Sequence, residues 1–214
     1  MPSQSVEEYL EAIYRIGGET GTVNTCELAT MLGVAPPSVT TMLARLTRDG
    51  LVEHTRYKGI KLTQSGREMA ASMIRRHRLS ERLLTDVLGM PWHRVHEAAC
   101  KLEHVMTGEI EERTYKALGE PERCPHGQML KGDDDESLVA LSSVEPGSKV
   151  RVVKLAEEKE EFLIAVEKLG LIPSAEVTIS SIIDSEICYS IAGNEHQISI
   201  DLAGLIWVCP VEPK

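Results

Sequence analysis

The sequence of 214 residues predicts a mainly α-helical protein with a small β domain at its C-terminal end. Apolar side chains recur at helical spacing through most of residues 5–118. From Lys149 onward, short runs of β-branched residues are typical of strands instead. Between the two patterns, residues 119–148 are rich in glycine, proline and acidic residues, which indicates a linker.

The net charge of −10 is confined to the C-terminal part of the chain. Residues 1–118 contain 15 basic and 15 acidic side chains, whereas residues 119–214 contain 8 and 18. The N-terminal part can therefore present a local basic surface to nucleic acid. The five irregularly spaced cysteines do not indicate a disulfide framework. Because there is also no signal-peptide pattern and no long apolar run, we expect a cytoplasmic protein without membrane contact.

Residues 5–17 are predicted to form the first helix, because their apolar positions follow helical spacing and Ser5 and Glu8 form a capping box. Glu8 and Glu11 lie one turn apart on this helix. Carboxylates placed in this way usually face solvent near the positive end of the helix dipole. Two of them together also form half of an oxygen-rich cation site.

The next segment has the pattern of a helix-turn-helix motif. Thr25 is expected to cap a short helix over residues 26–32, Gly33 makes the turn, and a second helix runs over residues 36–48. The outer face of the second helix carries short hydroxyls and arginines, which suit contact with base edges and phosphates. The residues expected to contact DNA there are Pro37, Ser38, Thr40, Thr41, Arg45 and Arg48.

A β-hairpin is predicted directly after this second helix, with strands over residues 51–57 and 60–62. Arg56 and Lys58 lie near its tip and are expected to contact DNA. Residues 35–61, which span the second helix and most of the hairpin, hold five basic and two acidic side chains. A helix-turn-helix pattern alone has many false positives, but the hairpin and its charge predict a winged-helix domain over residues 1–63.

Three further helices with apolar faces are predicted over residues 66–88, 92–105 and 109–118. Apolar helix faces outside a DNA-binding domain are best explained by dimerisation, since a palindromic operator requires two-fold symmetry in the protein. We therefore expect a homodimer that binds double-stranded DNA.

The predicted helix over residues 92–105 concentrates side chains that bind metals. At about 100° per residue, one face of about 100° contains His96, Cys100, Glu103 and His104. Polar residues at helical spacing usually form a solvated face, and a single cysteine is usually a small buried hydrophobe. Here the polar face lies beside the apolar face, which favours a metal site. One helix cannot complete a coordination sphere, so further ligands are expected elsewhere.

Other candidate ligands have weaker signals. His77 and Glu81 lie one turn apart on the helix over residues 66–88, although Glu81 would ordinarily pair with a neighbouring arginine. Cys124 and His126 form a Cys-x-His pattern within the linker, which by itself is a weak indication of metal binding.

Five strands and one helix are predicted after the linker. The strands are expected at Val150–Leu155, Glu176–Ile183, Ile187–Ile191, His196–Ile200 and Trp207–Val211, and the helix at Glu161–Leu169. Five short strands in so short a segment predict a small SH3-like barrel.

In this order, these segments resemble the metal-dependent repressors of the diphtheria toxin repressor (DtxR) and MntR superfamily. The resemblance is carried by HRLSERLLTDVLG, by VHEAACKLEHVM and by LGLIPSAEV, which is similar to FeoA-type domains. It extends over essentially the whole chain. It implies a winged helix-turn-helix domain (1–63), a helical dimerisation and metal-binding domain (64–120), a linker (121–148) and an SH3-like FeoA-type domain (149–214).

The resemblance also implies two metal sites in each subunit. The first would use Cys100, Glu103 and His104 with Glu8 from the first helix, and the second would use His77, Glu81 and His96. Streptococcal-type relatives add a Cys-x-His pair to the second site, and several relatives add a ligand from the barrel. The matching residues here are Cys124, His126, Glu158 and Glu161.

The resemblance implies a sensor of Fe²⁺ or Mn²⁺ that represses metal-uptake genes. Cys100 is a soft ligand that favours Fe²⁺, whereas Glu8 is a hard ligand that suits Mn²⁺, so the metal stays open. A metal-dependent hydrolase could use the same ligands, but its winged helix would have no role and no nucleophile motif is evident. A winged-helix regulator that responds to an organic ligand is the third possibility. Enzymatic activity is not expected.

Overall fold

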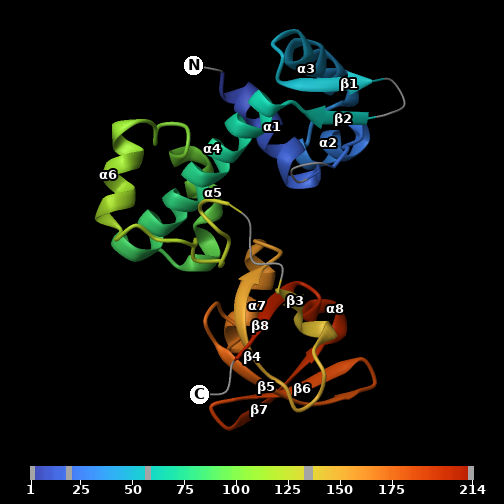
Figure 1. Ribbon diagram of the computed structural model, residues 1–214, viewed down its shortest axis with the longest axis vertical. Coiled ribbons are helices and arrows are strands. Elements are labelled where there is room, and N and C mark those ends of the chain that lie inside the picture. Colours follow the sequence, from blue (N-terminus) through green and yellow to red (C-terminus); the bar gives the residue numbers. More distant parts are fainter. Residues whose placement is uncertain (1–2, 18–20, 56–58, 133–136, 212–214) are drawn as a thin grey trace. The chain divides into compact units, whose positions relative to one another are not determined.

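The computed structural model describes residues 3–17, 21–55, 59–132 and 137–211 (Figure 1). The chain divides into two compact units. The first comprises Met1–His77 and Glu103–Thr107, and the second comprises Arg78–Leu102 and Gly108–Lys214. Each unit is built around a hydrophobic core of its own.

The first unit contains a winged helix. Its elements are α1 (Gln4–Gly17), α2 (Thr25–Leu32), α3 (Pro36–Arg48), β1 (Val52–Thr55) and β2 (Gly59–Leu62). The two strands are antiparallel, and apolar residues of all five elements form one buried core. The predicted helices and hairpin are confirmed within the described residues, and the predicted end of the first strand, at residues 56–57, lies outside them. Arg56 and Lys58 lie outside the described residues.

The sequence predicts Thr25 as the N-cap of α2, but the N-cap in the structure is Asn24. The Asn24 side chain accepts a hydrogen bond from the Glu27 backbone N–H, at 2.8 Å. The Glu27 carboxylate accepts one in return from the Asn24 backbone, at 3.2 Å. This reciprocal capping box satisfies two backbone donors, so the helix begins one residue later than its cap.

A third segment joins the hairpin. Val23 and Ile60 exchange both backbone hydrogen bonds, at 2.8 and 2.9 Å, in an isolated antiparallel bridge. Gly59 allows this approach, since a Cβ atom there would lie 2.3 Å from the Thr22 side chain and 2.9 Å from the Val23 carbonyl oxygen. Its φ of 84° also suits glycine. The bridge fastens the wing to the chain that enters α2.

The helix α4 (Gln64–Arg82) begins after Thr63, whose hydroxyl accepts from the Gly66 backbone N–H at 3.1 Å. It continues into one π-helical turn, Leu83–Val87. The predicted long helix is thus confirmed, with a change of hydrogen-bonding pattern at its end. Such π-helical turns are frequent near functional sites.

The prediction of one helix over residues 92–105 is wrong. The structure has a 3₁₀ turn at Trp92–Arg94, then α5 (His96–Leu102), then turns, and α6 (Glu109–Ala117) follows. Glu103 and His104 therefore leave the helix. They do so because their side chains bind partners on α4 and α1 within the first unit.

The C-terminal part of the second unit is one antiparallel sheet of six strands in the order β3-β8-β4-β5-β6-β7. The strands are β3 (Val139–Ala140), β4 (Lys149–Leu155), β5 (Glu176–Ile183), β6 (Glu186–Ile191), β7 (Asn194–Ser199) and β8 (Ile206–Pro210). Two helices accompany the sheet, α7 (Glu160–Lys168) and α8 (Ile200–Ala203). Irregularities of register in β4 and β5 bend the sheet. The five predicted strands and the helix are confirmed, β3 and α8 are additional, and Ile200 begins α8 although it was expected to end a strand.

Part of the predicted linker is ordered against this sheet. Arg123 and Met129 form a β-bridge across a tight loop. The Leu155 backbone N–H of β4 donates to the His126 carbonyl at 3.0 Å, and the Gln128 amide donates to the Leu155 carbonyl at 2.6 Å. The loop that carries Cys124 and His126 is therefore fixed to β4.

Within the described ranges, the helices are too short or too polar for any of them to cross a bilayer.

Candidate metal centres and nucleic-acid interface

A first candidate metal centre lies in the first unit and is formed by Glu11, His77 and Glu103. One ligand atom of each lies within 4.8 Å of the others. His77 Nδ1 and Glu103 Oε2 are 2.6 Å apart, and both side chains are almost fully buried. The three residues come from α1, α4 and the turn after α5. The centre thus joins the first helix of the winged-helix domain to two segments of the predicted dimerisation domain.

His104 extends this centre. Its Nε2 atom lies 3.7 Å from Glu103 Oε1, and its Nδ1 atom lies 3.0 Å from Glu7 Oε2. Glu8, the predicted ligand, is exposed, and its carboxylate accepts from the Gln4 amide at 3.0 Å. The structure therefore brings Glu7 to the centre and leaves Glu8 outside it, so Glu8 stays a prediction.

The electrostatics of this centre favour a cation. Burial raises the pKa of Glu103, the hydrogen bond with His77 opposes this rise, and the charge of Glu11 adds to it. A buried carboxylate beside a second carboxylate is costly without positive charge. Two carboxylates and two imidazoles form a donor set that suits Mn²⁺ or Fe²⁺.

A second candidate centre lies in the second unit and is formed by Glu81, Cys124 and His126. All three are buried, and one ligand atom of each lies within 4.8 Å of the others. Glu81 Oε1 and His126 Nδ1 are 3.2 Å apart. His126 Nε2 lies 2.9 Å from the Trp92 carbonyl oxygen and donates to it. This bond directs Nδ1 toward the carboxylate and leaves it available as a ligand.

His96 and Glu158 border the second centre. His96 Nδ1 and Glu158 Oε2 are 3.1 Å apart, and a ligand atom of each lies within 4.8 Å of one from Glu81. The resemblance alone had suggested Glu158 as a ligand. The structure brings it to this centre. Glu161 is exposed in the first turn of α7 and is not among the clustered residues that the structure describes.

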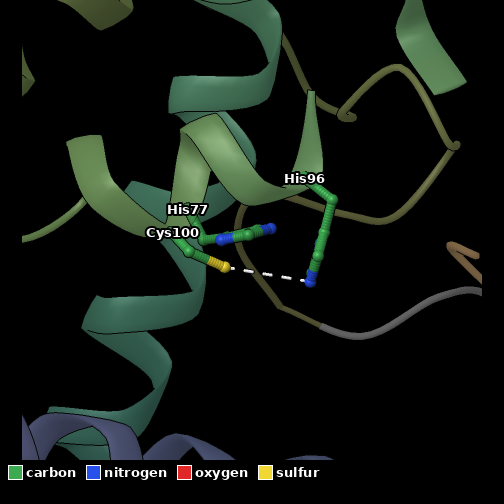
Figure 2. Close-up of side chains that lie close together, drawn as sticks. All are labelled: His77, His96 and Cys100. Atoms are coloured by element: carbon green, nitrogen blue, oxygen red, sulfur yellow. Dashed lines mark hydrogen bonds between the residues drawn. The ribbon is translucent and has the colours of Figure 1, made fainter. Parts of the chain in front are cut away.

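His96 and Cys100 lie one turn apart on α5, with Cys100 Sγ 3.8 Å from His96 Nε2 (Figure 2). The same view labels His77, which belongs to α4. Of the four residues expected on one helical face, only these two share a helix, because α5 ends at Leu102.

Negatively charged side chains also gather at the second centre. Burial raises the pKa of the Cys124 thiol well above its usual range, and the nearby carboxylates of Glu81 and Glu158 raise it further. Burial by itself lowers the pKa of His126, but the hydrogen bond and charge of Glu81 more than offset this, so the pKa is raised. A divalent cation would relieve this negative cluster and stabilise the thiolate.

The predicted DNA-contacting face of α3 is open. Its apolar side is formed by Val39, Leu43 and Leu46, which are fully buried. The exposed residues include all six predicted on this helix, Pro37, Ser38, Thr40, Thr41, Arg45 and Arg48. The helix therefore packs through one side and presents the polar and basic side to solvent.

Glu7 and Arg76 are two buried charged residues that the sequence analysis did not single out. A signal for Glu7 was present. It lies three residues before Leu10 and six before Ile13, which places it on the apolar face of the helix, whereas Glu8 lies about 100° further round and is exposed.

Comparisons with known proteins cover nearly the whole chain. Residues 1–60 match the family described as "Iron dependent repressor, N-terminal DNA binding domain". Residues 63–130 match "Iron dependent repressor, metal binding and dimerisation domain", and residues 139–210 match the FeoA domain. The second range includes Cys124 and His126.

Similar proteins include the iron-dependent repressor IdeR of Mycobacterium tuberculosis, 34% identical over 208 residues, or 90% of each chain. The diphtheria toxin repressor of Corynebacterium diphtheriae is 32% identical over 94% of this chain and 95% of its own. Among solved structures, T. acidophilum IdeR has a TM-score of 0.78 and 29% identity over 99% of this chain and 100% of that one. A manganese-dependent transcriptional repressor in complex with manganese has a TM-score of 0.85 and 27% identity over 96% and 100%.

A winged helix, a helical dimerisation domain with carboxylate and imidazole clusters and a FeoA-type sheet define a class of metal-dependent transcriptional repressors. The chain belongs to the family of iron-dependent repressors that includes IdeR and the diphtheria toxin repressor. The predicted fold class and family are thereby confirmed. Because these relatives are repressors, the expectation that the chain is not an enzyme is confirmed as well.

Proposed function

We propose that this protein acts in the cytoplasm as an Fe²⁺- or Mn²⁺-dependent repressor, and that its homodimer binds a palindromic operator of metal-uptake genes. The observation that carries this proposal is the cluster of Glu11, His77 and Glu103, in which His77 and Glu103 are buried and Glu11 is partly buried. It joins α1, which packs in the core of the winged helix, to α4 and to the turn after α5. Occupancy of this cluster is therefore coupled to the position of α1.

The ligands are proposed in two sets. The first ion would be held by Glu11, His77, Glu103 and His104, with Glu8 and Cys100 as further predicted ligands. The second would be held by Glu81, His96, Cys124, His126 and Glu158, with Glu161 as a further predicted ligand. The resemblance implied His77 for the second ion, but here it is proposed for the first, because it clusters with Glu11 and Glu103 in the first unit.

The coupling follows from the charges. A bound divalent cation supplies positive charge to a centre where a buried carboxylate and Glu11 otherwise repel each other. Glu11 of α1 and Glu103 of the turn after α5 would both hold the ion, and this would fix the first helix of the DNA-binding domain. A coupling of about 1–3 kcal/mol between metal binding and DNA binding is enough for a regulatory response.

Apolar exposure supports the homodimer. Val87, Leu88 and Ile110 have exposed fractions of 62%, 63% and 57% in the single chain. Val87 ends the π-helical turn after α4, Leu88 is the C-cap that follows it, and Ile110 lies in α6. All three fall within the range that matches the dimerisation domain of the family. Large apolar side chains exposed in this way are typical of surfaces that a partner covers.

The proposal is tested with a palindromic duplex selected from random DNA in the presence of protein and Mn²⁺. We expect Mn²⁺ or anaerobic Fe²⁺ to lower the Kd for this duplex at least about tenfold relative to protein in EDTA, or about 1.4 kcal/mol. Glu103→Gln and His104→Gln should abolish the metal response, because they remove ligands of the first centre. Their binding in EDTA should match that of the wild type.

Equal DNA affinity with metal and with EDTA would contradict the proposal and would favour a regulator that responds to an organic ligand. Glu68→Gln is the matched control, because it removes an exposed carboxylate of α4 outside both centres and should leave the metal response intact.

A further inference from the structure

Glu7 is a buried carboxylate that bridges two side chains of the first unit. It is 9% exposed. Its Oε2 atom lies 3.0 Å from His104 Nδ1, and its Oε1 atom accepts from Arg76 Nη2 at 3.3 Å. The three residues come from α1, the turn after α5 and α4. Glu7 is therefore held from both sides.

Arg76 fixes the far side of this carboxylate. It is 7% exposed, and its Nε atom donates to the Ser72 carbonyl one turn back on α4, at 3.3 Å. A buried guanidinium requires a partner with opposite charge, and Glu7 supplies that charge. The pair is thus a rigid support rather than a solvated surface ion pair.

The contact with His104 determines which ring nitrogen can bind a metal. An ionised carboxylate only accepts hydrogen bonds, so the proton between Glu7 and His104 belongs to Nδ1. In a neutral imidazole Nε2 then carries the lone pair, and Nε2 is the atom that faces Glu103, at 3.7 Å. A histidine whose other nitrogen donates to a carboxylate is the usual arrangement of a metal-binding imidazole.

We propose that Glu7, supported by Arg76, is the positioning carboxylate of the first metal centre. It sets the tautomer and the ring orientation of His104 and does not itself bind the ion. This inference rests on the proposed function, since it takes His104 as a ligand. The two adjacent glutamates of α1 then differ: Glu7 orients a proposed ligand, whereas Glu8 is exposed outside the centre and its role as a ligand stays a prediction.

The first test measures the tautomer in metal-free protein. Imidazole ¹⁵N NMR of the full-length protein, with the His104 signals identified from their loss in His104→Gln, should show a protonated Nδ1 and an unprotonated Nε2. In Glu7→Gln the signals should shift toward the Nε2-protonated form, because the charged acceptor is lost. Glu68→Gln should leave them unchanged. A purely structural role of Glu7 would alter the unfolding midpoint but not the tautomer.

The second test measures Mn²⁺ affinity by competition with a chelator. Glu7→Gln should raise the Kd of the first centre about 10- to 100-fold, the usual effect of removing such a partner. In a double-mutant cycle, Arg76→Met should raise the Kd in the wild-type background and have little effect in the Glu7→Gln background. The double variant also avoids an unpaired buried charge, so its fold is protected.

Two outcomes would overturn the inference. An unchanged tautomer and an unchanged Kd in Glu7→Gln would show that Glu7 does not position His104. Loss of the first ion as complete as in Glu103→Gln, with the His104 tautomer preserved, would make Glu7 a direct ligand. Either result leaves the wild-type metal response intact, whereas failure of the proposed function would appear as metal-independent DNA binding of the wild type.

Discussion

Tyr189 is a fully buried side chain in the core of the C-terminal sheet. Its hydroxyl donates to the Leu169 carbonyl at 2.9 Å, and its ring stacks on His196 with 5.5 Å between centroids. Burial raises the pKa of Tyr189 to about 12. The phenol is thus neutral in the folded protein at a pH where an exposed tyrosine has begun to ionise.

This shift gives a pH dependence of stability. The folded-state pKa lies above the value of about 10 for an exposed phenol. The contribution of Tyr189 to the free energy of unfolding is therefore complete below pH 10 and is lost as the pH rises toward 12. Tyr189→Phe should be less stable than the wild type by about 1 kcal/mol at pH 9, through the lost hydrogen bond. Urea unfolding at pH 9 and at pH 11 should show this difference shrinking, and a constant difference would contradict the assignment.

Single residues also mark the limit of prediction from sequence. Glu103, His104, His77 and Glu11 could be singled out as candidate ligands, because the chemistry of their side chains can be read from the sequence alone. The partner of His104 could not, because the choice between Glu7 and Glu8 depends on which face of α1 is covered. Glu7 and Glu8 are adjacent in the sequence, yet Glu7 is buried and Glu8 is exposed.

At the scale of elements, periodicity predicts a helix well and its end poorly. The apolar spacing after Trp92 continues beyond Leu102, yet α5 ends there. The energy of one more helical turn is small compared with the contacts that Glu103 and His104 make with residues of α4 and α1. These contacts are distant in sequence, and no local pattern contains them.

The helix α3 was predicted correctly, because its apolar spacing alone determines which side packs in the core. Arg45→Ala should weaken binding to the selected duplex several-fold and lower the salt dependence of binding by about one unit of slope, because one phosphate contact is lost. The Kd for Mn²⁺ should stay unchanged, since Arg45 lies outside both centres. Binding isotherms at several salt concentrations measure both effects.

Arg113→Ala is the matched control for this change, because Arg113 is an exposed arginine of α6 whose charge is removed in the same way. Equal weakening by the two variants would assign the effect to net charge and not to α3.

At the scale of the whole molecule, each compact unit has its own core and its own ligand cluster. The order of the domains could be predicted, because helical spacing gives way to strand patterns along the chain. The limits of the compact units could not, because α4 continues without a break from one into the other at His77. A helix gives no local sign of such a limit.

Metal should therefore stabilise each unit separately. At a concentration 100 times its Kd, an ion that binds only the folded state adds about 2.7 kcal/mol. Hydrogen exchange should show Mn²⁺-dependent protection in two places, around Glu103 and around His126. Glu103→Gln should lose the first and keep the second, and Cys124→Ser should do the reverse. Loss of both in either variant would mean that the two centres do not bind independently.

Gly127 has a consequence for how such proteins can be recombined. A Cβ atom there would lie 2.0 Å from the Val153 carbonyl oxygen, so the loop after His126 lies against the backbone of β4 with no space for a side chain. Two proposed ligands of the second ion, Cys124 and His126, thus lie in a loop whose conformation depends on the strand that follows it. A chimaera cut at residue 149 would join this loop to a foreign β4, whereas a cut near residue 120 would transfer loop and strand together. The module that can be exchanged between relatives therefore begins before this loop, and it includes part of the second candidate centre.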